Sequence, residues 1–426
     1  MNCKHKHWRG FRTINGLRGA PVLEFAFGAR FARRVRRDLS RTIFCVATLS
    51  FFLAGCSATN AVRLSTANIS NSFLTPIHDE ALMLVRKYQT SPLRAARMLA
   101  YLDTAVLETN RSMSETTSKN AACEHVAYAL ASYSLLAHFF PLETPGRLLS
   151  KPQLQSNWAD VNCDGAKVQA DVVAQATIAR AMRDGADPPK KIRAHPGRAT
   201  GLWEPTPPLF AANPTEPYAG EWVTMLIGNP AKLRLLPPPT VNSVEYRNAA
   251  DEAFSVAANL SATEKEIAEK WNLGAGSVTP AGVWNVRLHK IVGEERLSDK
   301  QVIEIFAAAH IAMHDALIAC SYSKYLYWTE RPITVAQRMG KSEFKPVLVT
   351  PSFPAYPSGH ACASGAAARV IGAYLPNRKG EVIALANEAA ESRVYGGIHF
   401  RFDVEEGLRL GEQVGDKVVS HFLATQ

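Results

Sequence analysis

Three short clusters of cationic and polar residues stand in the last quarter of this chain, between residues 324 and 403. Lysine offers a point charge, and each arginine offers a planar fork of donors that matches the oxygens of an oxyanion. A serine hydroxyl and a glycine N–H add donors that can approach an anion closely. Together they predict a cage for a tetrahedral oxyanion, built from Lys324, Arg331, Ser358, Gly359, His360, Arg393, His399 and Asp403.

The second cluster, Pro357 to His360, precedes a run of small residues that is typical of a closely packed helix. Free N–H groups and the helix dipole favour an anion at such an N-terminus. His360 and His399 are the candidates for proton transfer and for a bond to the central atom of the anion. Asp403, four residues after His399, is placed to bind the other ring nitrogen of His399 and fix its tautomer.

The order and spacing of these clusters resemble a known signature. They read Lys-x6-Arg-Pro, Pro-Ser-Gly-His and Ser-Arg-x5-His-x3-Asp, which is similar to the pattern shared by vanadium-dependent haloperoxidases and the type 2 phosphatidic acid phosphatase superfamily. The longer string from Pro351 to Ala361 resembles the haloperoxidase branch in particular. Segments 201–208, 278–285 and 314–318 also resemble bacterial haloperoxidase-like proteins, so the similarity covers most of the chain after about residue 75.

This resemblance implies a function and a role for each cage residue. The chain would be a vanadate-dependent haloperoxidase that oxidises halide with hydrogen peroxide to hypohalous acid, and phosphate could occupy the same site as vanadate. His399 would supply the axial bond to vanadium, and His360 would be the acid–base group. The equatorial oxygens of vanadate would be held by Lys324, Arg331, Ser358, Gly359 and Arg393.

The chain departs from the family pattern at positions that bear on the halide. Ser321 stands where fungal-type chloroperoxidases have a tryptophan, and Glu330 stands where an aromatic residue is usual. If the carboxylate of Glu330 points inward, it partly neutralises Arg331. Phe353 agrees with the chloroperoxidase type rather than with the bromoperoxidase type. The halide preference therefore stays open.

Two other functions use the same cage. In a periplasmic acid phosphatase, His399 would attack phosphorus to form a phosphohistidine, His360 would protonate the leaving group and Asp403 would orient His399. The substrate would then be a phosphate ester. We find no membrane-length apolar segment beyond the N-terminal region, which argues against an integral lipid phosphatase. The third alternative is an oxyanion-binding protein without turnover, which the presence of both histidines disfavours.

The N-terminal residues 1–56 have the pattern of a lipoprotein signal. Arginines precede the apolar run 42–55, which ends in small residues before Cys56. This predicts export and a lipid anchor at Cys56, in the periplasm or outer membrane. The same leader carries eleven of the 48 basic residues and two of the 38 acidic ones, so the net charge of +10 lies almost entirely within it. The mature chain is therefore nearly neutral, which argues against nucleic-acid binding.

Hydrophobic periods of three and four predict an all-α fold of two packed helical bundles joined by a proline-rich connector. Ser91 with Pro92, and Ser261 with Glu264, are typical helix N-termini. Alanine-rich sequence from 298 to 320 predicts a long helix that presents Lys324. The predicted divisions are a tether at 57–75, an N-terminal bundle at 76–187, the connector at 188–240 and a C-terminal bundle with the oxyanion site at 241–426.

Cysteines and histidines outside the cage carry weaker signals. The four cysteines of the mature chain can pair in three ways, and Cys123 with Cys163 is the favoured bridge because both lie in the first bundle. Cys362 is expected to be a small core residue. His310 and His314 have the i, i+4 spacing of metal ligands but lack the companion glutamate of a known motif, so we interpret them as packing or supporting residues. A homodimer is possible.

Overall fold

The computed structural model describes residues 72–115, 120–143, 163–187, 193–233 and 235–424. These residues form α-helices, short 3-10 turns and no β-strand, which confirms the predicted all-α fold. All belong to one compact unit, Leu64–Gln426. The predicted leader, Cys56 and most of the tether lie outside the described residues. The helices are α1 (Thr75–Lys87), α2 (Pro92–Glu115), α3 (Ala121–Phe139), α6 (Asp164–Ala181), α7 (Val244–Ala258), α8 (Ala262–Lys270), α9 (Thr279–Glu294), α10 (Asp299–Tyr327), α11 (Pro332–Arg338), α12 (Gly359–Tyr374), α13 (Lys379–Tyr395) and α14 (Arg401–Ala424).

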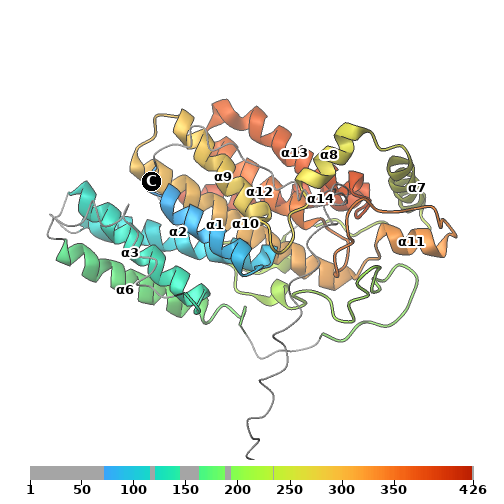
Figure 1. Cartoon of the computed structure of the whole chain (residues 1–426), viewed down its shortest axis with the longest axis horizontal. Coiled ribbons are helices and arrows are strands. Elements are labelled where there is room, and N and C mark those ends of the chain that lie inside the picture. Colours follow the sequence, from blue (N-terminus) through green and yellow to red (C-terminus); the bar gives the residue numbers. More distant parts are fainter. Residues whose placement is uncertain (1–71, 116–119, 144–162, 188–192, 234, 425–426) are drawn as a thin grey trace, which may run out of the picture. The chain divides into compact units, whose positions relative to one another are not determined.

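Helix α10 is the core around which the other helices pack. It contacts α2, α9, α12 and α14 and runs through the middle of the molecule (Figure 1). A capping box between Ser298 and Gln301 satisfies the free N–H groups at its start. By length and composition α10 could cross a membrane, so the expectation of no further membrane-length apolar segment was wrong. However, 94% of its apolar window is buried inside the protein, as in the core helix of a soluble fold.

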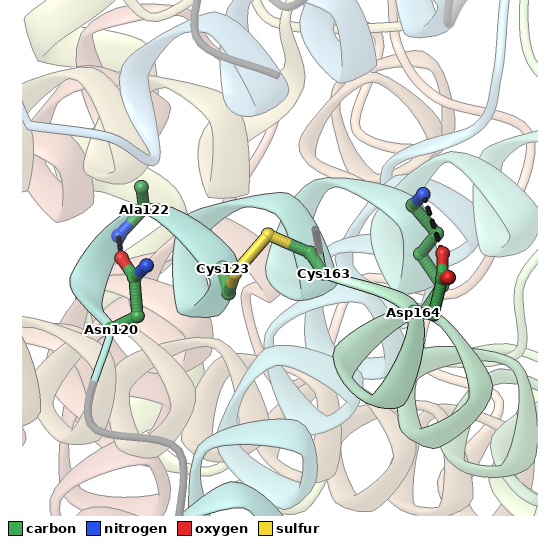
Figure 2. The surroundings of a disulfide bond; sticks show 6 residues. Asn120, Ala122, Cys123, Cys163 and Asp164 are labelled. Carbon is green, nitrogen blue, oxygen red and sulfur yellow. Dashed lines mark hydrogen bonds and ion pairs between the residues drawn. A yellow bond between two sulfur atoms is a disulfide. The ribbon is translucent and has the colours of Figure 1, made fainter. Parts of the chain in front are cut away.

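The N-terminal helices form a group closed by a disulfide. Helix α3 packs on α2 and α6, and Cys123 of α3 is bonded to Cys163, which precedes α6 (Figure 2). The favoured pairing is therefore confirmed. Ser91 Oγ accepts a hydrogen bond from the Arg94 N–H at 3.4 Å, as expected of the residue that begins α2.

The described part of the connector is anchored on α10 by a carboxylate. Asp315 is fully buried and accepts hydrogen bonds from the backbone N–H groups of Met225, Leu226 and Ile227 at 2.7, 2.8 and 3.1 Å. Trp203 is also fully buried, and its backbone N–H donates to the Trp328 carbonyl at 2.6 Å. The connector therefore packs beside the end of α10, next to the residues that lead to Arg331.

Close packing of α12 on α14 sets the position of the Ser358 turn. Glycines recur every four residues along α14, and at Gly411 a Cβ would lie 2.2 Å from the Cys362 carbonyl oxygen of α12. Only a residue without a side chain allows this approach. The Ser358 N–H in turn donates to the Asp403 carbonyl at the start of α14, at 2.8 Å.

We expect Gly411→Ala to lower the free energy of unfolding by about 3 kcal/mol or more, because the new methyl group overlaps backbone that cannot move aside. Gly380→Ala is the matched control: it lies near the start of α13, and a Cβ there meets no atom within 4 Å. Gly380→Ala should change stability by no more than about 1 kcal/mol. Urea unfolding followed by circular dichroism measures both, and equal effects would contradict the packing argument.

Candidate active site

Lys324 and Arg331 come from the two sides of the turn that follows α10. Trp328 ends the helix with left-handed backbone (φ 51°), and its N–H bonds the Lys324 carbonyl at 2.9 Å. Arg331 is the residue before α11. Both side chains turn inward onto the segment before α12. Lys324 Nζ donates to the carbonyls of Pro354 and Ala355 at 2.8 and 2.7 Å.

Phe353 lies against both cations. Its ring centroid is 5.1 Å from Lys324 Nζ and 5.0 Å from the Arg331 guanidinium carbon. Its carbonyl accepts from Arg331 Nε at 2.9 Å. Cation–π attraction and this hydrogen bond fix the direction of the guanidinium.

Ser358 and Gly359 begin α12, as the sequence predicts. Ser358 is fully buried at the N-cap position, but its Oγ bonds no backbone N–H of the helix. This hydroxyl is free to serve another group. At Gly359 a Cβ would meet Leu317 Cδ2 at 3.7 Å, an ordinary contact, so packing against the protein does not by itself require glycine there.

His399 is held between an acid and a cation. Its Nδ1 lies 2.9 Å from Asp403 Oδ2, and its Nε2 lies 3.0 Å from Arg331 Nη1. A guanidinium can only donate, so Nε2 carries the lone pair and Nδ1–H donates to Asp403. Burial, with the charges of Arg331, Lys324 and Arg393, holds the pKa of His399 well below its usual value. The ring is therefore a neutral ligand or nucleophile at Nε2.

His360 and Arg393 meet at one backbone oxygen. The Trp271 carbonyl, just after α8, lies 3.0 Å from His360 Nε2 and accepts from Arg393 Nη2 at 2.6 Å. Because a carbonyl can only accept, His360 carries its proton on Nε2, which leaves Nδ1 as the basic nitrogen. Burial and the charge of Arg393 lower the pKa of His360 well below its usual value.

Glu330 points away from the cage. Its carboxylate accepts hydrogen bonds from the Tyr246 hydroxyl and from Arg338 Nη2, the latter at 2.5 Å. The inward orientation considered from the sequence is therefore not adopted. Glu330 does not bond Arg331, and it instead ties α7 to α11.

The cage has buried positive charge and unused polar atoms. Lys324, Arg331 and Arg393 are each at most 4% exposed. Burial lowers their pKa values to about 8, about 10 and about 9. Burial also raises the pKa of Asp403 to about 7, so the one carboxylate bonded to His399 is a weak counter-charge. Arg331 Nη2, Ser358 Oγ and Asp403 Oδ1 are buried without a hydrogen-bond partner. A tetrahedral oxyanion would satisfy the two donors and balance the charge.

A second polar group lies away from the cage. His78, Asp103 and His310 are buried, and their ligand atoms lie within 4.8 Å of one another. Asp103 bonds both histidines, and His78 Nδ1 lies 2.8 Å from His289 Nε2. A central carboxylate repels an oxyanion, so this group is not a second oxyanion cage. His310 therefore belongs to this supporting cluster.

All eight residues singled out in the sequence lie in or against this site. Sequence reasoning missed the backbone carbonyls that aim the side chains: Trp271, Phe353, Pro354, Ala355 and Ile398. Since every residue has a carbonyl, side-chain identity carries no signal for them. Phe353 was noted as a family marker, but its contact with both cations was not.

The comparisons with known proteins agree with this geometry. Residues 304–383 and 380–425 match the family model described as the VCPO second helical-bundle domain. No curated protein sequence matches the chain.

Solved structures share the fold. A bacterial vanadium-dependent iodoperoxidase superposes with a TM-score of 0.69 at 24% identity, covering 83% of this chain and 96% of that one. The apo form of a bacterial vanadium-dependent chloroperoxidase has a TM-score of 0.63 at 15% identity, covering 77% and 92%. The holo form of a bacterial vanadium-dependent chloroperoxidase superposes with a TM-score of 0.62 at 15% identity, covering 84% of this chain and 96% of that one.

We expect Arg331→Lys to weaken binding of orthophosphate roughly tenfold to a hundredfold, because lysine loses the donor at Nη2 and the fork geometry. Arg338→Lys is the matched control, since Arg338 lies at the other end of α11 and pairs with Glu330. It should leave affinity within about twofold. Isothermal titration calorimetry measures both, after circular dichroism has verified folding. An equal loss in the two variants would refute the assignment of Arg331 to the cage.

Proposed function

We infer that this chain, which has the fold and the second helical-bundle domain of the vanadium-dependent haloperoxidases, is a vanadate-dependent haloperoxidase that oxidises halide with hydrogen peroxide to hypohalous acid. The observation that carries the proposal is His399 Nε2. Its lone pair stands on Nε2 because Asp403 holds the opposite nitrogen, and it accepts a hydrogen bond from the buried guanidinium of Arg331 at 3.0 Å.

The residues present fit vanadate. Arg331 Nη2 and Ser358 Oγ are buried donors without a partner, and a tetrahedral oxyanion supplies acceptors for them. Lys324 and Arg393 would add the remaining positive charge, and the neutral His399 would bind vanadium through Nε2. Bound vanadate would supply the Lewis acid that activates hydrogen peroxide.

His360 is proposed as the acid–base group. Its low pKa keeps the imidazole neutral at physiological pH, so it can take a proton from incoming peroxide. The Trp271 carbonyl holds Nε2–H, which directs this transfer to Nδ1. Arg331, Lys324 and Ser358 stabilise the negative charge that develops on oxygen during the reaction.

A phosphatase remains the second candidate because His399 Nε2, oriented by Asp403, would also serve as a nucleophile that attacks phosphorus. The purified chain from Ser57 onward should halogenate a phenol reporter with hydrogen peroxide and bromide, chloride or iodide only after orthovanadate is added. Phosphate should compete with vanadate and suppress the reaction. Hydrolysis of p-nitrophenyl phosphate that vanadate inhibits, without halogenation, would instead assign phosphoryl transfer to the cage.

Two histidine variants separate binding from turnover. We expect His399→Ala to abolish vanadate binding and all halogenation, because it removes the nitrogen that would bind vanadium. His360→Ala should keep vanadate binding and lose about 10²–10⁴-fold in turnover. His421→Ala, on an exposed part of α14, is the control and should match the parent. Vanadate titration measures binding and the phenol assay measures turnover. Near-normal vanadate affinity in His399→Ala would refute the role of His399 as the vanadium ligand.

We further propose that Cys56 is lipidated and tethers the enzyme in the periplasm or at the outer membrane. The support is the arginine-rich stretch and the apolar run that precede it. Cys56→Ser should move the expressed protein from the membrane pellet to the soluble fraction of a Gram-negative host, because the acceptor thiol is lost. Unchanged membrane association would contradict a lipid anchor at this residue.

A further inference from the structure

Three buried polar side chains meet in the core where the proposed reaction does not use them. They are His78 of α1, Asp103 of α2 and His310 of α10, and each is at most 1% exposed. His310 and Lys324 both stand on α10, and the rise of an α-helix places them about 20 Å apart along its axis. Because polar groups are costly to bury in an apolar core, this cluster needs an explanation of its own.

The three side chains meet at the carboxylate of Asp103. Its Oδ1 lies 2.8 Å from His78 Nε2, and its Oδ2 bonds His310 Nδ1. The three candidate ligand atoms all lie within 4.8 Å of one another. Two imidazole nitrogens and a carboxylate oxygen are ligands of zinc and of related divalent transition metals. Zinc bonds of about 2 Å set tetrahedral ligand atoms about 3.3 Å apart, so small side-chain movements suffice to hold a cation here.

The outer nitrogen of the His78 ring has an acceptor of its own. His78 Nδ1 lies 2.8 Å from His289 Nε2, and His289 Nδ1 lies 3.3 Å from Thr75 Oγ1. When a metal takes His78 Nε2, the ring proton moves to Nδ1 and donates to His289, which donates in turn to Thr75. Metal-bound histidines in proteins almost always donate the other N–H in this way, which fixes the orientation of the ring.

His310 has an equivalent arrangement on its outer side. Its Nε2 lies 3.5 Å from Asn285 Nδ2, and Asn285 Oδ1 is buried without a hydrogen-bond partner. Turning the Asn285 amide over puts this oxygen beside His310, where it accepts the Nε2–H when Nδ1 binds a metal. The apolar ring of Phe306 closes the cluster, with its centroid 4.9 Å from the His78 ring and 6.0 Å from the His310 ring.

We propose that His78, Asp103 and His310 bind one divalent transition-metal ion, zinc in particular, as a structural site that joins α1 to α2 and α10. The second carboxylate oxygen of Asp103 or a water molecule would complete the coordination. The site is separate from the oxyanion cage, and the proposal does not rest on the haloperoxidase function. Since its ligands are far apart in the sequence, a bound ion would stabilise the folded chain by its binding free energy.

The test measures metal content and stability on the chain from Ser57 onward, purified without a polyhistidine tag. Mass spectrometry of the metals, vanadium included, should find about one zinc ion per chain, and added phosphate should not lower it because phosphate competes only for the cage. Removing zinc with 1,10-phenanthroline should lower the thermal unfolding midpoint by about 5 °C or more, and added zinc should restore it.

Two variants locate the ion. Asp103→Asn keeps the size of the side chain but removes the charged ligand, so zinc affinity should fall at least about tenfold. His314→Gln is the matched control: His314 is also buried on α10, one turn after His310, but lies outside the ligand group. It should keep the zinc content of the parent.

Two results would overturn the proposal. One is a parent chain that neither retains nor takes up a transition metal and whose unfolding midpoint does not respond to zinc. The other is equal zinc affinity in the parent and in Asp103→Asn. If Asp103→Asn does not fold, removal and return of zinc on the parent still decide the matter. No measurement here involves halogenation, so failure of this proposal and failure of the proposed function are distinguishable.

Discussion

Uncompensated positive charge in the protein interior is the constraint on which the rest of this structure depends. Lys324, Arg331 and Arg393 are buried together, and their lowered pKa values record the cost of placing them there. Backbone carbonyls offset part of this cost, since each of the three donates to at least one. Asp403 offsets little because burial weakens it as an acid. A bound oxyanion would offset the rest of this cost. The buried positive charge that destabilises the empty site is therefore the same charge that binds the anion.

The helices serve this requirement by holding short segments at fixed separations. Helix α10 carries Lys324, and the contact of α14 with α12 through Gly411 sets Ser358 against Asp403. The Trp271 carbonyl at the end of α8 accepts hydrogen bonds from both His360 and Arg393 and so orients their side chains. The cage groups therefore lie at or beside the ends of α10, α11, α12, α13 and α14, where backbone groups that the helix leaves unpaired can bond side chains.

Side chains of the same chemical class have different roles here because they have different hydrogen-bond partners. Glu330 and Asp403 are both buried acids near Arg331, yet Glu330 binds Tyr246 and Arg338 while Asp403 binds His399. Histidines follow the same rule, because the partner of one ring nitrogen decides what the other can do. At His399 the acid leaves a lone pair on Nε2, whereas at His360 a carbonyl leaves it on Nδ1.

The amino-acid sequence by itself determined the all-α class, the cage residues and the His399–Asp403 pair, and it favoured the Cys123–Cys163 bridge among three possible pairings. Most of these depend on local relations: helical periodicity, a helix N-terminus at Ser358, and an i, i+4 spacing that brings histidine and aspartate together. Tertiary structure alone decided where Glu330 points, which carbonyls hold Arg393, and how His310 joins His78 and Asp103. Those contacts join residues distant along the chain, and they form only when packing fixes one helix against another, a relation that no local pattern encodes.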